Sequence, residues 1–208
     1  MSGKTRHGKR WMEEHVDDEF VRRAKKEGWR SRAVYKLSEI LEKDRLLKPG
    51  MTVVDLGAAP GAWSQYASRA VGRHGRVIAV DLLPMEALPG VEFIEGDFRE
   101  QATLEALQAA LGDARPGLVL SDMAPNISGV TSVDQPRGMY LAELALDFAR
   151  AQLAPGGGLV TKVFQGAGSD ALVAEARKYF ETVRMRKPKA SRDRSREVYL
   201  VAGNYRVM

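Results

Sequence analysis

Residues 53–63, VVDLGAAPGAW, run from a β-branched apolar segment through a glycine-rich turn into a segment compatible with a helix. This strand–turn–helix order is typical of an open α/β sheet, whose ligands bind at the carboxyl ends of the strands. Gly57 and Gly61 permit unusual backbone dihedral angles and let a ligand approach the main chain closely. The glycine spacing matches neither G-x-G-x-x-G nor the G-K-[ST] phosphate loop, which argues against hydride transfer and nucleotide hydrolysis.

Strand-like and helix-like segments alternate along the rest of the chain. We expect strands at residues 52–56, 76–81, 91–97, 117–122 and 158–164, and helices at 63–72, 100–111, 136–153 and 169–180. Two closing strands, 182–187 and 197–202, are joined by a charged connection and are expected to pair antiparallel. This alternation predicts an α/β fold with a Rossmann-like, doubly wound sheet of seven strands, mostly parallel, in which the last strand is antiparallel.

The segment before the sheet is predicted to be helical. Residues 13–27 have the pattern of a polar helix, and residues 32–43 that of an amphipathic helix for which Ser31 is a candidate cap. Residues 1–12 are expected to become ordered only when a partner binds. A length of 208 residues suits one domain, or one domain with an extension.

Composition excludes several classes of protein. There is no cysteine, so neither disulfides nor thiolate metal sites are possible. His7, His15 and His74 are scattered, so we expect no metal site. No apolar run approaches the roughly 20 residues of a membrane span. The basic N-terminus has no apolar core behind it and is not a secretory signal, so we expect a cytoplasmic protein with no membrane contact.

Charge is distributed unevenly along the chain. Residues 1–48 carry a net charge of +5, residues 49–176 a net charge of −7, and residues 177–208 a net charge of +7. If the two basic ends meet in space, they form a surface suited to a polyanion. We expect phosphate contacts from Lys4, Arg6, Lys9, Arg10, Arg22, Arg23, Lys25, Lys26, Arg30, Arg32, Lys187, Lys189, Arg192, Arg194 and Arg196. Solvated basic tails are the alternative.

Acidic residues lie at or near the ends of four predicted strands: Asp55, Asp81, Asp97 and Asp122. Asp81 can accept both hydroxyls of a ribose, and Asp97 with Phe98 can accept an amino group and pack on an adenine face. Together the acids suit a cationic ligand that carries adenosine, such as S-adenosylmethionine. A divalent metal is the competing ligand, and helix capping is the structural alternative.

Lys162 stands in the middle of the predicted strand VTKVF, residues 160–164. A strand in the centre of a parallel sheet is covered on both faces, and an unpaired ammonium there is costly. This residue therefore needs either a functional role or a route by which its charged end reaches water.

Several strings resemble the FtsJ/RrmJ family, the RlmE-type ribosomal RNA 2′-O-methyltransferases. They are GWRSRAVYKL at 28–37, VVDLGAAPGAWSQY at 53–66, DLLPM at 81–85, GDF at 96–98, SDMAPNISG at 121–129, PRGMYLAELAL at 136–146, KVFQG at 162–166 and RKPKASRDRSREVYLVA at 186–202. The similarity covers nearly the whole chain from Trp11 onward. Ala62 and Ala167 are small departures from the commoner family pattern.

The resemblance implies a Rossmann-like methyltransferase that uses S-adenosylmethionine. It also implies methylation of a uridine ribose in the A-loop of 23S rRNA of the large ribosomal subunit. The family's catalytic set corresponds to Lys36, Asp122, Lys162 and Glu197, and its cofactor residues to Gly61, Trp63, Asp81, Asp97 and Asp122. The glycine turn and the end of the third strand add Gly57 and Phe98 to the expected cofactor residues. Residues 1–208 would then be a single methyltransferase domain in which residues 1–30 form a basic RNA-binding extension.

This resemblance gives Lys162 a role. A ribose 2′-hydroxyl is a weak nucleophile until a base removes its proton, and a lysine with a lowered pKa can be that base. Burial and the charge of Lys36 would lower the pKa of Lys162, whereas Asp122 would raise it; the sequence does not rank these effects. Asp122 would orient Lys162, while Lys36 and Glu197 position the ribose.

Two alternatives stay open at this point. The same chemistry can act on another RNA, such as a tRNA or an mRNA cap, and a non-catalytic RNA-binding assembly factor is the second possibility. Lys36 can instead be a simple phosphate contact, and Glu197 a structural ion pair among arginines. The polar surface helices favour a monomer.

Overall fold

The computed structural model describes residues 18–192 and 195–207. Within them, one sheet has the strand order β3-β2-β1-β4-β5-β7-β6. The strands are β1 (Thr52–Leu56), β2 (Arg76–Asp81), β3 (Val91–Glu95), β4 (Leu118–Ser121), β5 (Gly158–Phe164), β6 (Phe180–Arg186) and β7 (Glu197–Tyr205). The first five are parallel, and β7 pairs antiparallel with both β5 and β6. The predicted fold class and the antiparallel last strand are confirmed.

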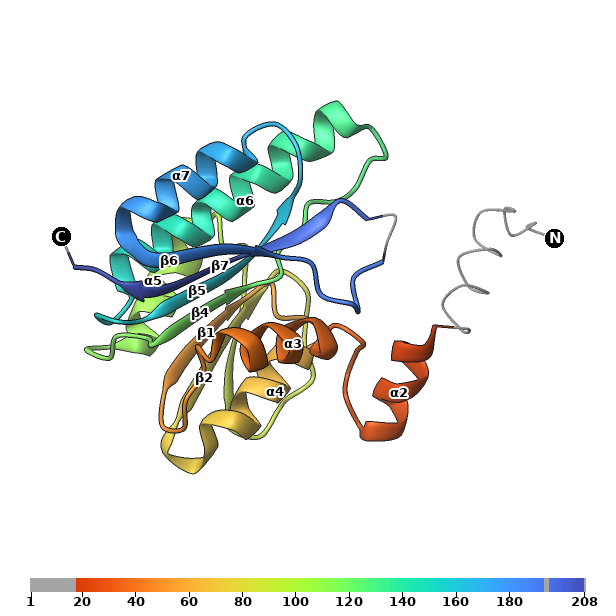
Figure 1. Ribbon diagram of the computed structural model, residues 1–208. Helices are drawn as coiled ribbons and strands as arrows, with labels where there is room; N and C mark the ends of the chain where they lie inside the picture. Colours follow the sequence, from red (N-terminus) through yellow and green to blue (C-terminus); the bar gives the residue numbers. More distant parts are fainter. Residues whose placement is uncertain (1–17, 193–194, 208) are drawn as a thin grey trace.

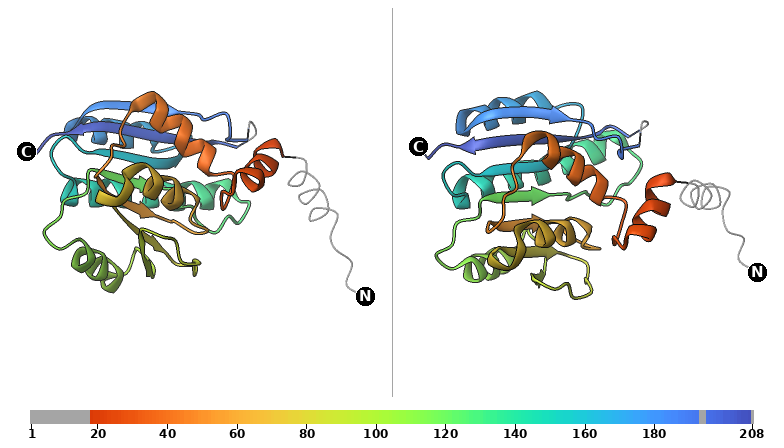
Figure 2. Two further views of the ribbon diagram at one scale, coloured as in Figure 1. Left: turned by 90° about the horizontal axis from the view of Figure 1, so that it is seen from below. Right: turned by 60° about the horizontal axis from the view of Figure 1, so that its bottom comes forward.

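Helices cover both faces of the sheet (Figure 1). They are α2 (Glu19–Glu27), α3 (Val34–Asp44), α4 (Ala62–Val71), η1 (Gly72–His74), α5 (Gln101–Leu111), α6 (Thr131–Gln152) and α7 (Ser169–Tyr179). One apolar core joins α5, α6 and α7 to the sheet, and a second joins α3 and α4 to its other face. Figure 2 shows both layers in two further views.

Strand residues alternate between these two cores. Along β1, Val54 and Leu56 belong to the α5–α7 core, whereas Val53 belongs to the α3–α4 core. Along β5, Val163 faces α5–α7 and Val160 faces α3–α4. This alternation follows from the two-residue period of a strand. The central strands therefore consist almost entirely of buried residues, as expected for a sheet covered on both faces.

Two helix starts differ from expectation. Ser31 is not the N-cap of α3; its Oγ accepts a hydrogen bond from the amide of Ala33 at 3.2 Å, and the helix begins at Val34. Helix α6 begins at Thr131, five residues before the expected start at Pro136, so this boundary was wrong. Asp134 anchors the first turn of α6 by accepting bonds from Ser128 and Gly129. Pro136 lies on an exposed part of the helix, where water can serve the carbonyl that loses its partner.

Helix α2 packs onto the body of the protein. Ala24 is buried in a small cluster that includes Tyr35, Ala62 and Ala190. Asp18 caps the helix by accepting from the amide of Phe20, and Asp18 also pairs with Arg32. The expected helix at 13–27 is thus observed from Glu19, and its earlier part, like residues 1–12, lies outside the described residues. No helix of the described residues is long and apolar enough to cross a membrane.

Candidate active site

The site lies at the carboxyl ends of the five parallel strands, β1 to β5. Immediately after β1, Gly57 has a φ of +74°, and a Cβ there would lie 2.8 Å from Cγ and 2.9 Å from the backbone of Met123. The amide of Asp122 in turn donates to the carbonyl of Leu56 at 3.1 Å. Only glycine allows this close approach between the first turn and the segment that carries Asp122.

A cavity of about 360 Å³ opens beside this turn. Of the predicted cofactor residues, those that line it are Gly57, Asp81, Asp97, Phe98 and Asp122. Arg99, Met123 and Tyr140 also line it, and sequence reasoning did not single them out. The acids that the sequence placed at separate strand ends are therefore brought to one cavity, with the exception of Asp55.

Gly61 and Trp63 lie outside the described lining of this cavity. Gly61 precedes α4 with a φ of +102° and is covered by Met85 and Leu88. Trp63 is buried, and its Nε1 donates to the carbonyl of Ala33 at 2.8 Å. Both residues therefore lie where the glycine turn and α4 pack against neighbouring segments, next to the cavity lining rather than in it.

Asp81 connects two loops. Its Oδ2 accepts from the amide of Ala59 at 2.8 Å, and its Oδ1 accepts from the amide of Leu83 at 2.8 Å. Each carboxylate oxygen retains capacity for a further hydrogen bond, since an ionised carboxylate has about four acceptor sites. Asp81 can therefore accept two hydroxyl groups without losing either backbone contact.

Asp97 has a protein partner that the sequence did not predict. The guanidinium of Arg99 donates to both of its oxygens, with Nη2 at 2.6 Å from Oδ2 and Nε at 2.9 Å from Oδ1. These bonds lower the pKa of Asp97. The adjacent Phe98 packs edge-on against Phe148, with ring centroids 5.5 Å apart. Asp97 keeps its place in the cavity lining, already fixed in direction by this ion pair.

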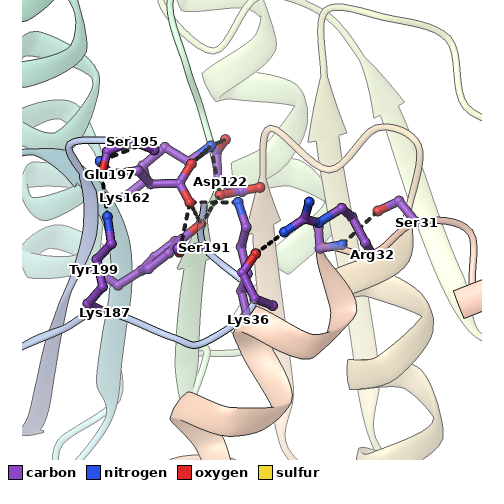
Figure 3. A network of polar contacts seen from close by, with 12 residues as sticks. Ser31, Arg32, Lys36, Asp122, Lys162, Lys187, Ser191, Ser195, Glu197 and Tyr199 are labelled. Atoms are coloured by element: carbon purple, nitrogen blue, oxygen red, sulfur yellow. Dashed lines mark hydrogen bonds and ion pairs between the residues drawn. The ribbon is translucent and has the colours of Figure 1, made fainter. Parts of the chain in front are cut away.

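Lys162 lies at the centre of a buried polar cluster (Figure 3). Its Nζ is 2.8 Å from Asp122 Oδ1 and 3.6 Å from Glu197 Oε2, and it donates to the Asp122 carbonyl at 3.0 Å. The side chain of Lys162 is only 8% exposed. The ammonium is thus paired and hydrogen-bonded rather than extended into water, which excludes the route of escape considered from the sequence.

Lys36 joins the same cluster from α3. Its Nζ is 2.6 Å from Glu197 Oε1, and Ser191 Oγ donates to that same oxygen at 3.1 Å. Figure 3 shows Lys36 approaching from the helix while Lys162 and Glu197 come from the sheet. All four predicted catalytic residues are therefore in one connected network of ion pairs.

Tyr199 completes the network and was not predicted as a site residue. Its hydroxyl is 2.8 Å from Asp122 Oδ1 and 3.2 Å from Glu197 Oε1, so it lies between the two carboxylates. Tyr199 faces Lys162 across the β5–β7 pair and lies two positions after Glu197 on the same strand. The signal available in the sequence was this two-residue spacing, which places both side chains on one face.

The electrostatics of the cluster decide the sign of the Lys162 pKa shift, which the sequence left open. Burial lowers the pKa of Lys162, but the charges of Asp122 and Glu197 outweigh it and leave the pKa above its ordinary value. Burial raises the pKa of Glu197, but Lys162 and Lys36 outweigh it and hold the pKa at about 2. Two ammonium groups thus balance two carboxylates, and Lys162 carries its proton at neutral pH. A lowered lysine pKa is not a property of the protein alone.

Asp55 lies beneath the site rather than in it. It is fully buried on β1, where Ser64 of α4 donates to its Oδ2 at 2.6 Å. Its Oδ1 has no hydrogen-bond partner among the described residues. Burial raises the pKa of Asp55 to about 7. Over residues 18–192 and 195–207, no group of three His, Asp or Glu side chains is arranged to hold a metal ion.

Comparisons with known proteins point to one protein family. Residues 29–205 match the model of the FtsJ-like methyltransferase family. Proteins named ribosomal RNA large subunit methyltransferase E, from two strains of Xanthomonas oryzae pv. oryzae, PXO99A and MAFF 311018, are each 57% identical over 207 residues, which is 100% of this chain and 99% of theirs.

Solved structures share the architecture. A Plasmodium falciparum protein described as a ribosomal RNA methyltransferase superposes with a TM-score of 0.76 at 29% identity, over 85% of this chain and 98% of that one. A Clostridium thermocellum structure, at 17% identity and a TM-score of 0.54 over 80% of this chain and 96% of its own, shares the fold alone. The family model matches most of the chain, and the two relatives share high identity with it over their full length. The cavity and the buried lysine cluster are consistent with both matches. The chain therefore belongs to the FtsJ-like methyltransferase family.

Proposed function

We propose that this protein methylates the ribose 2′-hydroxyl of a uridine in the A-loop of 23S rRNA, with S-adenosylmethionine as the donor. The single observation that carries the proposal is the buried Lys162–Asp122 pair at the edge of the cavity, since Asp122 belongs to both. Full-length similarity to relatives named ribosomal RNA large subunit methyltransferase E supports the choice of substrate.

The cavity suits the donor by size and chemistry. S-adenosylmethionine carries its methyl group on a positively charged sulfonium, which makes that methyl electrophilic. Asp81 offers free acceptor capacity on both oxygens for ribose hydroxyls, and Asp97 and Phe98 line the same cavity. Acidic residues outnumber the described cations Arg99 and Arg137 in the lining, which favours a cationic ligand.

Lys162 and Asp122 are proposed as the catalytic pair. Asp122 fixes the Lys162 ammonium at two points, through its carboxylate and its carbonyl. Lys162 is protonated in the free protein and must lose that proton before it can accept one from a ribose hydroxyl. A positive charge bound in the cavity lowers the pKa of Lys162, because like charges repel. Alignment by this fixed network then contributes most of the rate.

Lys36, Glu197 and Tyr199 are proposed to hold the ribose and balance charge. Glu197 contacts both ammonium groups, and Tyr199 lies between the two carboxylates. The apparent pKa of the reaction is therefore a property of the cluster around Lys162 rather than of one residue. We expect a monomer as the active form, because the surface helices are polar.

RNA is proposed to bind along the two basic segments. Arg32 donates to the carbonyl of Ala190 and pairs with Asp18 at the start of α2, so the two segments are neighbours. Exposed or half-exposed basic side chains along them include Arg22, Arg23, Lys25, Lys26, Lys187, Lys189, Arg192 and Arg196. Arg30 and Arg32 are also half-exposed, but their guanidinium groups are bound to protein oxygens. Residues 1–30 then act as an RNA-binding extension of the single domain 1–208. The phosphate contacts predicted for Lys4, Arg6, Lys9, Arg10 and Arg194 lie outside the described residues. A cytoplasmic location fits a ribosomal substrate.

A methylation assay tests the proposal. Purified protein is incubated with labelled S-adenosylmethionine and either 23S rRNA, large subunits or tRNA from unmodified cells, and the product is mapped by mass spectrometry. We expect one ribose methyl in the A-loop. Lys162→Met should lower kcat by about 100-fold or more, the usual scale for a general base, whereas the exposed Lys48→Met should match wild type.

Two outcomes would contradict the proposal. Methylation of tRNA with none in 23S rRNA would move the activity to another RNA, and no incorporation into any RNA would favour an assembly factor. Binding is checked separately, because S-adenosylmethionine, and not NAD, should raise the melting temperature of the folded protein.

A further inference from the structure

Arg30 occupies the junction between the basic helix α2 and the body of the protein. Its amide donates to Oε1 of Gln65 on α4 at 3.1 Å, and Nε2 of Gln65 donates to the carbonyl of Gly28 at 2.9 Å. This pair of bonds fixes the backbone of the junction to α4. The Arg30 side chain therefore begins from a defined position rather than from a free loop.

The guanidinium of Arg30 is engaged with protein carbonyls. Nη1 donates to the carbonyls of Pro60 at 3.0 Å and Glu86 at 2.7 Å, and Nη2 donates to that of Ala87 at 2.9 Å. Pro60 belongs to the glycine turn after β1, whereas Glu86 and Ala87 belong to the loop between β2 and β3. A planar guanidinium with five donors suits such a bridge between two loops.

The same two loops hold Asp81. Its two oxygens accept from Ala59, next to Pro60, and from Leu83, in the β2–β3 loop. Arg30 and Asp81 therefore join the loops at two points, one on the outside and one at the cavity. Gly61 lies between them: a Cβ on it would be 3.0 Å from Nη1 of Arg30 and 2.7 Å from Sδ of Met85.

We propose that Arg30 is a positioning residue for the cofactor site: it sets the spacing of the two loops and thereby the direction of the Asp81 carboxylate. This rests on the proposed use of that carboxylate to bind S-adenosylmethionine. It also separates Arg30 from the phosphate-contacting residues with which the sequence grouped it, because its donors are directed at the main chain.

Two substitutions of Arg30 and one matched control test this role. Arg30→Met keeps the aliphatic stem and removes every donor, Arg30→Lys keeps the charge but cannot span both loops, and Arg22→Met makes the same change at an exposed arginine of α2. Calorimetry gives the Kd for S-adenosylmethionine, and methylation kinetics give its KM and the kcat at saturation. Filter binding at several salt concentrations gives RNA affinity.

For Arg30→Met we expect the Kd and KM for S-adenosylmethionine to rise by about tenfold or more, the scale of lost charge-assisted hydrogen bonds. The kcat at saturation and the salt slope of RNA binding should stay close to wild type. For Arg30→Lys, the Kd and KM for S-adenosylmethionine should fall between those of wild type and those of Arg30→Met. Arg22→Met should show the reverse pattern, with unchanged cofactor affinity and weaker, less salt-dependent RNA binding.

An unchanged Kd for S-adenosylmethionine in both Arg30 variants would overturn the inference. A shallower salt slope in Arg30→Met would instead assign Arg30 to a phosphate. Melting temperatures without ligand identify a general loss of stability, and if Arg30→Met does not fold, Arg30→Lys alone decides the outcome. Failure of the wild-type protein to bind S-adenosylmethionine would refute the proposed function and, with it, the role of Arg30, whereas wild-type binding with unchanged Arg30 variants would overturn the role of Arg30 alone.

Discussion

At the scale of single residues, Glu197 affects the protonation of Lys162, although Asp122 is the nearer carboxylate. Its Oε2 lies 3.6 Å from Lys162 Nζ, and its negative charge contributes to the raised pKa of that lysine. A carboxylate that raises the pKa of a base delays its deprotonation as pH increases. The charge of Glu197 therefore contributes to the pH at which Lys162, the proposed base, loses its proton.

Glu197→Gln should move the rising limb of the kcat–pH profile to lower pH. Removing the negative charge leaves the protonated Lys162 less stabilised, so its pKa falls and the neutral form appears at lower pH. The measurement is kcat at saturating substrates across neutral and alkaline pH. Glu39→Gln, which removes a carboxylate paired with Lys43, is the control. A limb that stays in place or moves to higher pH would contradict the electrostatic account.

Asp55 predicts a pH dependence of stability. Its pKa is about 7 when folded, against an ordinary value of 3.8, so the folded protein holds a proton that the unfolded chain has released. Stability therefore falls as pH rises from about 4 to 7, and the full penalty is present above pH 7. Asp55→Asn cannot titrate and should gain stability relative to wild type, on the order of 2 kcal/mol between pH 5 and pH 8.

Urea denaturation at these two pH values measures the difference. Asp113→Asn, which makes the same substitution at an exposed position, provides the control. An equal free-energy difference between Asp55→Asn and wild type at both pH values would mean that Asp55 ionises normally in the folded protein.

At the scale of elements, the turn after β1 depends on one close approach. A Cβ at Gly57 would meet the Cα and the amide nitrogen of Met123 at 2.9 Å, so the backbone itself would have to move. Gly57→Ala should lower the free energy of unfolding by about 2–4 kcal/mol, through a positive φ and overpacking together.

Gly28→Ala separates these two causes. Gly28 has a φ of +72° at the end of α2, and nothing lies within 4 Å of an added Cβ. It should cost only about 1–2 kcal/mol, the price of the left-handed backbone alone. Urea denaturation, at an unchanged m-value, gives the free energy of unfolding of both variants. Equal losses would show that Met123 moves aside without measurable energy.

The start of α6 shows why element boundaries were less predictable than element types. Helical spacing of Leu141, Leu144, Ala145 and Phe148 indicated the helix correctly, whereas Pro136 suggested its beginning. The true start depends on Asp134, whose carboxylate accepts bonds from Ser128 and Gly129 before the helix. Such a bond depends on how a loop folds back, which no local periodicity records.

At the scale of the whole molecule, basic residues lie at both the carboxyl and the amino ends of the parallel strands, but RNA is proposed to bind only at the carboxyl ends. Helix α2, residues 187–192 and residues 195–196 lie near the carboxyl ends of the parallel strands, beside the site. The amino ends carry other basic residues, including Lys48 before β1, Arg73 before β2 and Arg115 before β4. Only the first group is placed to contact an RNA that reaches Lys162.

RNA binding should therefore respond to charge by location. Replacing Arg22, Lys25 and Lys26 with Gln should reduce the magnitude of the slope of log K against log salt by about 2. Fewer phosphate contacts form on binding, so fewer counterions are released. Replacing Lys48, Arg73 and Arg115 with Gln removes the same formal charge and should leave the slope nearly unchanged. Equal slopes for the two triple variants would show that only net charge matters.

The sequence by itself determined the order of strands and helices and the glycine turn, and its motifs pointed, through a family resemblance, to the four charged residues that the structure joins in one cluster. These are local in origin: strand periodicity, turn chemistry and motifs each occupy a few consecutive positions. It also indicated that Lys162 needed a partner, since a buried ammonium is costly without one.

Only the tertiary structure decided how those residues act on one another. Lys36 and Glu197 are separated by 161 positions yet lie 2.6 Å apart, and Tyr199 joins Asp122 from 77 positions away. The sign of the pKa shift of Lys162 depends on the balance of burial against two such distant charges. Coulomb energies change steeply with distance and with exposure to water, and both are set by packing rather than by position in the chain.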